Sequence, residues 1–148
     1  MAKIQILVGT VMGTAQGVAE FIQKELGDTH QIDVNLDPKV EDLTRDETEF
    51  LVFCTSNTGN GDLPDNIAPL YVALTSEFPR IAYRKYALIN LGDSSYPTFG
   101  QAGQDLDAAL QDIGASPVSA PLTIDATMER YPQKRALDWI RPLINTLD

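Results

Sequence analysis

The sequence predicts an α/β fold: a three-layer sandwich in which a five-stranded parallel sheet, with strand order 2-1-3-4-5, lies between two layers of helices. Strand-like apolar segments alternate with segments of helical period along the whole chain, which is typical of parallel strands joined by crossover helices. Two strand-like segments are almost continuously apolar, as central strands are, and two others have the composition of edge strands. No repeat or linker interrupts this alternation, so residues 1–148 are expected to form one domain.

The first half of the chain is expected to supply three strands. KIQILVG (3–9) is the first strand, and the helix after it repeats its apolar residues at helical spacing and closes at Gly27. QIDVNL (31–36) alternates apolar and polar residues as an edge strand does, whereas FLVFC (50–54) is apolar throughout. The next helix is expected to begin near Pro64. Its apolar face would carry Ile67, Leu70, Tyr71, Leu74 and Phe78.

The second half is expected to supply two strands and two helices. YALINL (86–91) is the second central strand, and the helix that follows it ends at Gly114. SPVSAPLTI (116–124) is the last strand, at an edge because proline cannot donate a ladder hydrogen bond. A final helix from about Pro132 contains Pro142, which should kink it.

Composition narrows the class of protein. With 148 residues, 43% hydrophobic and 22% charged, the chain resembles ordinary soluble domains, and no apolar run reaches the roughly 18 residues of a transmembrane helix. We therefore expect no membrane partner, and MAKIQILVGT at the start resembles a strand more than a signal peptide. A single cysteine, Cys54, excludes an internal disulfide and fits a reducing cytoplasm. The net charge of −10 argues against nucleic acid as a partner; it favours a basic protein surface, or serves solubility alone.

The first strand ends in GTVMGTA (9–15), which predicts an anion site. Glycines at 9 and 13 let the backbone approach a ligand closely, and the amides of residues 11–15 would converge at the start of a helix. Free N–H groups and the helix dipole can hold a phosphate without a cation. The alternative is a plain turn between strand and helix.

Motifs of known phosphate-handling proteins are absent from the sequence. The loop lacks the Lys of G-x-x-x-x-G-K-S/T and the pattern G-x-G-x-x-G. A receiver domain would have Asp where the third strand ends in Cys54, and a phosphatase with this Cys as nucleophile would need an Arg after it. Because the transition state of phosphoryl transfer requires cationic help, the loop suits a phosphate that is bound and does not react.

Two further loops should lie beside this one, because the carboxyl ends of parallel strands meet at one edge of the sheet. CTSNTGNGDLPDN (54–66) follows the third strand and LGDSSYPTFG (91–100) follows the fourth. The first of these is either a turn with exposed amides and carbonyls or a generic loop; the aromatic residues Tyr96 and Phe99 in the second either pack on a flat ligand or plug the local core. Together the three loops could hold a monophosphate and sandwich a planar ring.

These loops resemble those of the flavodoxin family, and the resemblance covers essentially the whole chain. It is greatest to short-chain bacterial flavodoxins of the MioC type and to the FMN domains of diflavin reductases. TVMGTA (10–15) is similar to S/T-x-T-G-x-T/A, and SNTGNGD (56–62) to S-T-x-G-x-G-D. The motif L-G-x-x-x-Y-x-x-F is matched at Leu91, Gly92, Tyr96 and Phe99.

The resemblance implies noncovalently bound FMN, with no catalytic side chain and no metal. The phosphate would be held by Thr10, Val11, Met12, Gly13, Thr14 and Ala15. One side of the isoalloxazine ring would be lined by Ser56, Asn57, Thr58, Gly59 and Asn60. Tyr96 would stack on the other face, and the pyrimidine edge would be surrounded by backbone of Leu91, Gly92, Asp93, Phe99 and Gly100. Asp125 occupies the place of an acid near the flavin in diflavin reductases.

Two residues depart from the family pattern. Met12 stands where the family often has Thr, which removes a hydroxyl from the phosphate loop, and Thr58 stands where many relatives have Tyr or Trp. We expect looser FMN binding or a less extreme reduction potential as a result.

The function implied by the resemblance is one-electron transfer in the cytoplasm. The expected donor is a ferredoxin/flavodoxin–NADP reductase, and the acceptor is an unidentified redox enzyme. One alternative is an FMN-dependent NAD(P)H:quinone or flavin reductase, which Thr58 in place of an aromatic residue makes easier to accommodate. The other is an FMN-free interaction module of the same fold, against which Tyr96 and the intact glycine loops argue.

Overall fold

The computed structural model describes residues 2–58 and 60–147. The strands are β1 (Lys3–Gly9), β2 (Gln31–Asn35), β3 (Glu49–Ser56), β4 (Lys85–Gly92), β5 (Ser116–Pro117) and β6 (Leu122–Asp125). The α-helices are α1 (Thr14–Leu26), α2 (Ala68–Ser76), α3 (Gln101–Asp112) and α4 (Pro132–Asn145), and Val40–Leu43 form a short 3₁₀ helix.

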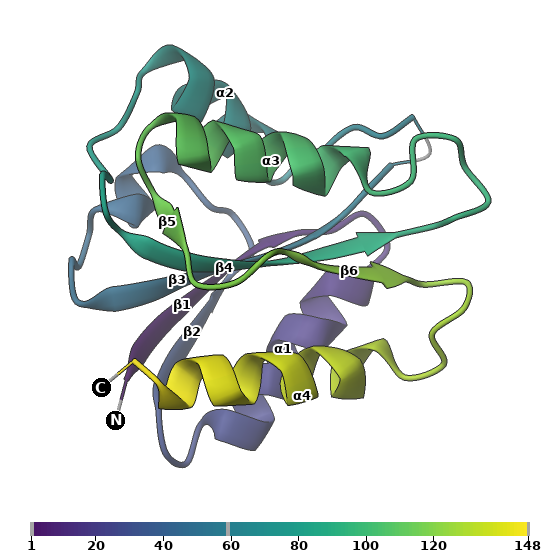
Figure 1. Ribbon diagram of the computed structural model, residues 1–148, viewed down its shortest axis with the longest axis horizontal. Coiled ribbons are helices and arrows are strands. Elements are labelled where there is room, and N and C mark those ends of the chain that lie inside the picture. The colour runs from purple at the N-terminus through teal and green to yellow at the C-terminus, as the bar shows by residue number, and fades with distance from the viewer. Residues whose placement is uncertain (1, 59, 148) are drawn as a thin grey trace.

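The sheet is parallel and has the order β2-β1-β3-β4-β5, with β6 also pairing with β4. Helices α1 and α4 cover one face of the sheet, and α2 and α3 cover the other (Figure 1). Each face has its own apolar core, because the central strands β1, β3 and β4 are buried on both sides. The predicted three-layer sandwich and strand order are confirmed.

The last strand differs from its prediction, because it consists of two short pieces. Tyr86 of β4 pairs with Pro117 and Ile89 pairs with Leu122, so three steps along β4 correspond to five on the edge strand. Two extra residues are therefore accommodated between β5 and β6. Proline at 117 and 121 explains the break, since neither can donate a ladder hydrogen bond. Residues 116–124 thus give two strands of a six-stranded sheet instead of one strand.

Helix α2 also differs in detail from its prediction. Helix α2 begins at Ala68, after a turn in which the Pro64 carbonyl accepts N–H groups from Ile67 and Ala68. Phe78 is not on its apolar face; it lies beyond the helix with φ of 50° and an exposed side chain. Helix α4 extends through Pro142 to Asn145.

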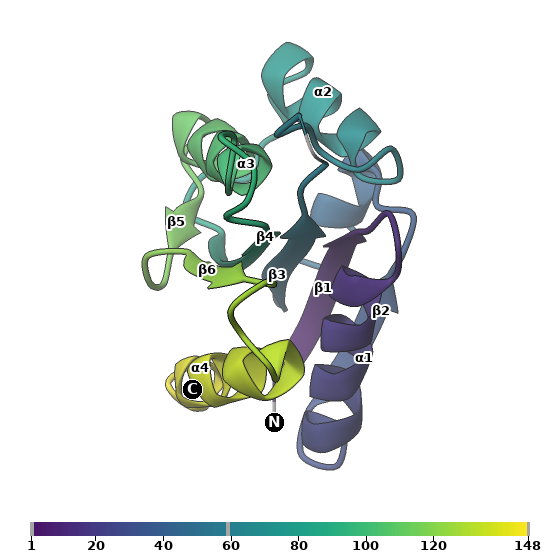
Figure 2. The ribbon, with the colours of Figure 1, turned by 90° about the vertical axis from the view of Figure 1, so that its right-hand side faces the viewer.

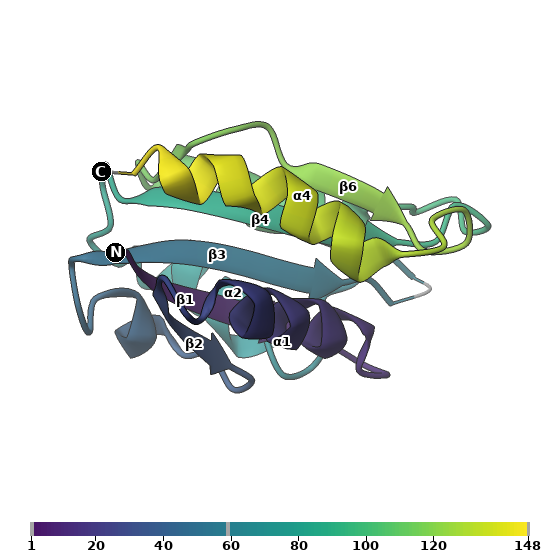
Figure 3. The same ribbon diagram turned by 90° about the horizontal axis from the view of Figure 1, so that it is seen from below.

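The loops that follow β1, β3, β4 and β6 all project from the carboxyl edge of the sheet (Figure 2). The view from below shows α1 and α4 lying side by side across the sheet, with the loop before α1 at the same end as the loop after β6 (Figure 3). This edge brings together three of the sequence motifs and the residue Asp125.

Candidate functional site

The loop between β1 and α1 presents a row of unpaired amides. Gly13 caps α1 with a φ of 89°, and its N–H donates to Thr10 Oγ1 at 2.8 Å. Within the described chain, no hydrogen-bond partner is found for the N–H groups of Val11, Met12, Thr14, Ala15 and Gln16. The convergence of these amides on one anion stays a prediction, and the Gly13 N–H, which it included, is already used within the loop.

The side chains of the loop divide between solvent and core. Val11 and Met12 are exposed, Met12 by 92%, and Thr14 is exposed at the first turn of α1. Ala15 is fully buried and packs in the core. The surface of the loop can thus contact an anion through amides and the hydroxyl of Thr14.

Asn66 holds this loop in place, and sequence reasoning missed it. Its Oδ1 accepts the Thr10 N–H at 2.9 Å, while its Nδ2 donates to the carbonyls of Val8 at 2.7 Å and Leu36 at 3.0 Å. One side chain thus ties the end of β1 to the segment after β2. The P-D-N sequence before α2 was the available signal, but it indicated only the start of a helix.

The loop after β3 is closed by its own hydrogen bonds. The Thr58 N–H donates to the Asp62 carbonyl and the Gly61 N–H to the Thr58 carbonyl, both at 2.9 Å. Ser56 Oγ donates to the Gly9 carbonyl at 3.3 Å, which links this loop to β1. Asn60 is exposed at the tip of the turn. Gly59, predicted to line the ring, lies outside the described residues.

The side chain of Asn57 has a structural role that the sequence did not reveal. Its side chain makes three hydrogen bonds, to Asn90, Leu91 and Ala102, so it faces the β4–α3 junction. Only its main chain can therefore line a ligand at this point. Asn90, buried within β4, was missed because it stands in an otherwise apolar strand.

In the loop after β4, the two aromatic residues have separate roles. Phe99 packs on Gly92, where an added Cβ would lie 2.7 Å from the Phe99 ring. This agrees with the alternative that an aromatic residue plugs the local core. Tyr96 is 48% exposed and can contact a ligand. Leu91 and Gly92 are buried, and Gly100 starts α3 with a φ of 75°.

The loop after β6 is linked to the loop after β4 through Asp125. Its Oδ1 accepts the N–H of Ser94 at 3.2 Å and the hydroxyl of Thr127 at 2.7 Å. These hydrogen bonds stabilise the carboxylate and lower the pKa of Asp125 from 3.8 to about 2. The contribution of Ser94 is the largest, followed by that of Thr127. Asp93 likewise accepts the N–H and the hydroxyl of Ser95. Both carboxylates therefore brace their loops.

Comparison with known proteins agrees with this geometry. The profile of the flavodoxin family matches residues 6–139. The chain belongs to the flavodoxin family. Its relatives include "Flavodoxin YqcA" of Pectobacterium carotovorum, which is 38% identical over 100% of this chain and 99% of the relative. "Protein MioC" of Escherichia coli O157:H7 is 31% identical over 99% of each.

Solved structures confirm the flavodoxin fold of the chain. A cysteine-to-alanine mutant of flavodoxin from Pseudomonas aeruginosa superimposes with a TM-score of 0.88 at 33% identity, over 98% of each chain. The chain is also 32% identical to the sulfite reductase [NADPH] flavoprotein alpha-component of Vibrio cholerae, over 98% of this chain but 23% of that protein. This agrees with the resemblance to diflavin reductases.

Membership of the flavodoxin family implies FMN as cofactor, and the groups at the carboxyl edge fit it. Five unpaired amides and the Thr14 hydroxyl provide donors for a phosphate, and no Lys, Arg or His occurs in residues 9–16. Tyr96 supplies an accessible aromatic side chain on a neighbouring loop.

Cys54, at the centre of the same edge, is not a nucleophile. It is buried, and burial raises its pKa from 9.0 to about 12, so the thiolate is rare at neutral pH. Among the described residues, no group of His, Cys, Asp or Glu has an arrangement that could hold a metal. Nor does any helix in the described ranges reach the length and apolar character needed to cross a membrane.

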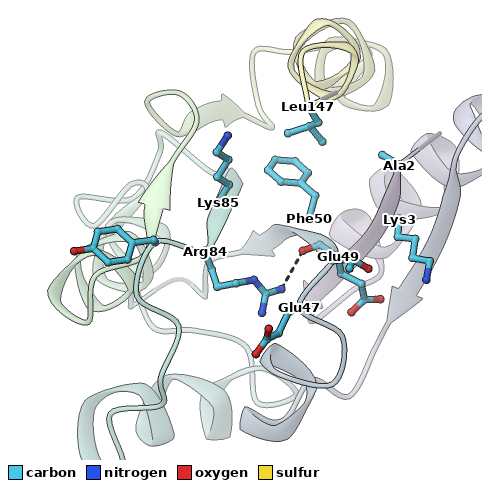
Figure 4. Close-up of a pocket in the computed structure, with 10 residues that line it drawn as sticks. Ala2, Lys3, Glu47, Glu49, Phe50, Arg84, Lys85 and Leu147 are labelled. Atoms are coloured by element: carbon cyan, nitrogen blue, oxygen red, sulfur yellow. Dashed lines mark hydrogen bonds between the residues drawn. The ribbon is translucent and has the colours of Figure 1, made fainter.

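A cavity of about 630 Å³ lies at the opposite edge of the sheet, where β3 and β4 begin (Figure 4). Phe50 and Leu147 form apolar parts of its wall, and Lys85 lies beside them. The Arg84 guanidinium is already bound to main-chain carbonyls, including those of Leu43 at 2.6 Å and Glu49 at 2.9 Å. The lining of the cavity includes no residue of the three flavodoxin motifs.

Proposed function

We propose that this chain is an FMN-containing electron-transfer protein that carries single electrons between a reductase and acceptor enzymes. The observation that carries the proposal is the row of unpaired amides at the start of α1, next to two braced loops, in a chain of the flavodoxin family. Such an arrangement suits a phosphate monoester joined to a planar ring.

The first loop binds the phosphate in this proposal. The N–H groups of Val11, Met12, Thr14 and Ala15 and the Thr14 hydroxyl donate to its oxygens. Thr10 contributes indirectly, because its hydroxyl accepts the Gly13 N–H and so fixes the turn. The helix dipole of α1 adds to the attraction of a dianion.

The other two loops enclose the ring. Main chain of residues 56–58 and 60 lines one side, and the side chain of Tyr96 covers the other. Phe99 and Gly100 shape the loop that presents Tyr96, and Asp93 and Asp125 brace it. Ser56 fixes the loop after β3 to β1. Bound FMN supplies the chemistry, which is the uptake and release of one electron at a time.

The protein also sets the ease of electron uptake. No cationic side chain in the first loop offsets the phosphate charge, and the chain carries a net charge of −10. Both disfavour an additional negative charge on the ring, so the second electron should be accepted only at a low potential. The exposed loops leave an edge of the ring accessible to a partner protein.

The proposed partners follow from membership of the flavodoxin family and from the negative charge of the chain. The donor is a ferredoxin/flavodoxin–NADP reductase, and the acceptor is another redox enzyme. Both partners have a basic docking surface that complements the negative charge of this chain. The single domain of residues 1–148 acts in the cytoplasm, where the one buried thiol remains reduced.

A second candidate is an FMN-dependent NAD(P)H:quinone or flavin reductase. The observation that favours it is Thr58, a small side chain where many relatives have an aromatic one, which leaves room over one ring face. Mixing the FMN-loaded protein with NADPH alone distinguishes the two functions. Slow or no bleaching supports the electron carrier, and rapid bleaching supports the reductase.

The proposed function is tested by adding FMN to the apoprotein and recording its visible spectrum during stepwise reduction. A yellow complex of one FMN per chain, with reduction in two one-electron steps, is expected. A protein that remains colourless with excess FMN would instead support an interaction module of the same fold.

A further inference from the structure

Two asparagine side chains connect the loops that flank the proposed ring site. Asn57 Nδ2 donates to Asn90 Oδ1 at 2.7 Å and to the Leu91 carbonyl at 2.9 Å. Asn57 Oδ1 accepts the Ala102 N–H at 2.6 Å. Asn90, which is 1% exposed, donates in turn to the Gly100 carbonyl at 2.9 Å. The pair thus joins the loop after β3 to both ends of the loop between β4 and α3.

Asn57 also caps helix α3 from another part of the chain. The residue before α3 is Gly100, which has no side chain to satisfy the N–H groups of the first turn. Asn57 Oδ1 takes the place of a local cap at Ala102. Because this acceptor belongs to the neighbouring loop, any displacement of that loop is transmitted to the start of α3.

Gly103 provides the space that the pair requires. A Cβ added to Gly103 would lie 2.1 Å from Asn90 Cγ, and no backbone strain explains a glycine inside α3. Glycine in a helix is unfavourable relative to alanine, so its presence is explained by the buried amide that it admits.

We infer that Asn57 and Asn90 are positioning residues for the flavin ring, which fix the spacing between the described residues of the loop after β3 (56–58 and 60–62) and residues 93–100 before the cofactor binds. This inference rests on the proposed function. The amide of Asn57 donates two of its hydrogen bonds and accepts the third, which a single hydroxyl cannot do in the same way. Asn66 provides the contrast, because its side chain holds the phosphate loop at Thr10 and bonds otherwise to Val8 and Leu36, which belong to neither ring loop.

The test compares the affinity of the apoprotein for FMN with that for riboflavin, which has the ring but lacks the phosphate. Asn57→Ala is expected to weaken both ligands by the same factor, about tenfold, because the ring site is loosened while the phosphate loop is intact. Gly103→Ala should act in the same direction, since it displaces Asn90. Asn66→Ala should weaken FMN more than riboflavin. Asn145→Ala, at the exposed end of α4, is the matched control and should change neither.

Several results would overturn the inference. These are unchanged affinity for riboflavin in Asn57→Ala, a loss confined to FMN, or a lower thermal stability of the apoprotein without any loss of riboflavin affinity. If wild-type protein binds neither ligand, the proposed function fails and the inference fails with it. Should Asn57→Ala not fold, Asn57→Thr and Gly103→Ala give the same comparison.

Discussion

At the scale of single residues, Met12 is the clearest departure of the phosphate loop from its family. Its side chain is 92% exposed beside unpaired amides, so it contributes neither to the core nor, through a polar atom, to an anion. The loop keeps its amides but lacks a hydroxyl at this point. The Met12 side chain can therefore be changed without disturbing the fold.

We predict that Met12→Thr strengthens FMN binding. A threonine hydroxyl can donate an additional hydrogen bond to the phosphate, worth about 1 kcal/mol, or about a fivefold gain in affinity. Riboflavin affinity should not change, because that ligand has no phosphate. Titration of the apoprotein with each ligand measures both effects, and equal gains for the two would contradict a phosphate contact.

Asp125 should keep its loop braced over a wide range of pH. The carboxylate is stabilised by hydrogen bonds from Ser94 and Thr127, and its pKa lies at about 2 instead of 3.8. A lowered pKa in the folded state means that this contribution to stability is complete above about pH 4 and is lost as the pH falls through about 2. NMR titration of the Ser94 and Thr127 amides checks this. A midpoint near the ordinary value of a free carboxyl would show that the bracing is absent in solution.

At the scale of elements, two glycines with positive φ separate backbone strain from packing. Gly13 has a φ of 89° and nothing within 4 Å of an added Cβ, whereas Gly61 has a φ of 80° and an added Cβ would lie 2.7 Å from Thr98 Cβ. Both loops therefore require a left-handed residue, but only the loop after β3 packs closely against its neighbour.

We expect Gly13→Ala to lower the free energy of unfolding by roughly 1–2 kcal/mol, the cost of a left-handed conformation in a residue with a side chain. Gly61→Ala should lower it further, because the new methyl group also displaces the loop of residues 93–100. Urea unfolding of the two apoproteins provides the comparison. If both variants were destabilised equally, the loop of residues 93–100 would be able to move away from the new methyl group without a loss of stability.

The elements show what the sequence could and could not predict. Period and apolar runs placed the strands β1 to β4 and the parallel order, because burial on one or both faces leaves a pattern in neighbouring residues. The break between Pro117 and Leu122 was missed, although its prolines pointed to an irregular edge. Phe78 matched the helical period, but the chain had already left the helix.

The sequence was sufficient to predict which loops form the candidate site, but not which side chains make contacts between them. Gly and Thr at the ends of strands indicate turns with exposed amides, so the phosphate loop could be proposed from the sequence. The roles of Asn57, Asn66 and Asn90 depend on partners up to 58 residues away along the chain. A buried amide in one sequence carries no sign of the residue that it will meet.

At the scale of the whole molecule, charge is the dominant feature. The chain has 21 acidic and 11 basic side chains, with a net charge of −10. Fields of this kind attract a partner of opposite sign over about 10 Å at moderate salt and speed its approach. The association rate should therefore depend on this charge more strongly than the affinity of the final complex does.

We predict that reduction of the FMN-loaded protein by an NADP-linked reductase slows roughly tenfold as ionic strength rises from low values to about 0.5 M. Stopped-flow measurement of the second-order rate constant tests this. Reduction by a neutral small molecule serves as control and should be insensitive to salt. A rate that rises with salt would indicate that the reductase docks on a surface of the same sign.

The burial of Cys54 also decides how the molecule can be studied. It is the single cysteine of the chain, and its thiol is protonated and enclosed under native conditions. A maleimide should therefore react only with a cysteine that is introduced at the surface, so spin labels can be attached without first replacing Cys54. Labels could be placed at Asn60→Cys in the loop after β3 and at Met128→Cys in the loop after β6, both of which are exposed positions. Electron paramagnetic resonance would then show whether the distance between these two loops changes when a ligand binds.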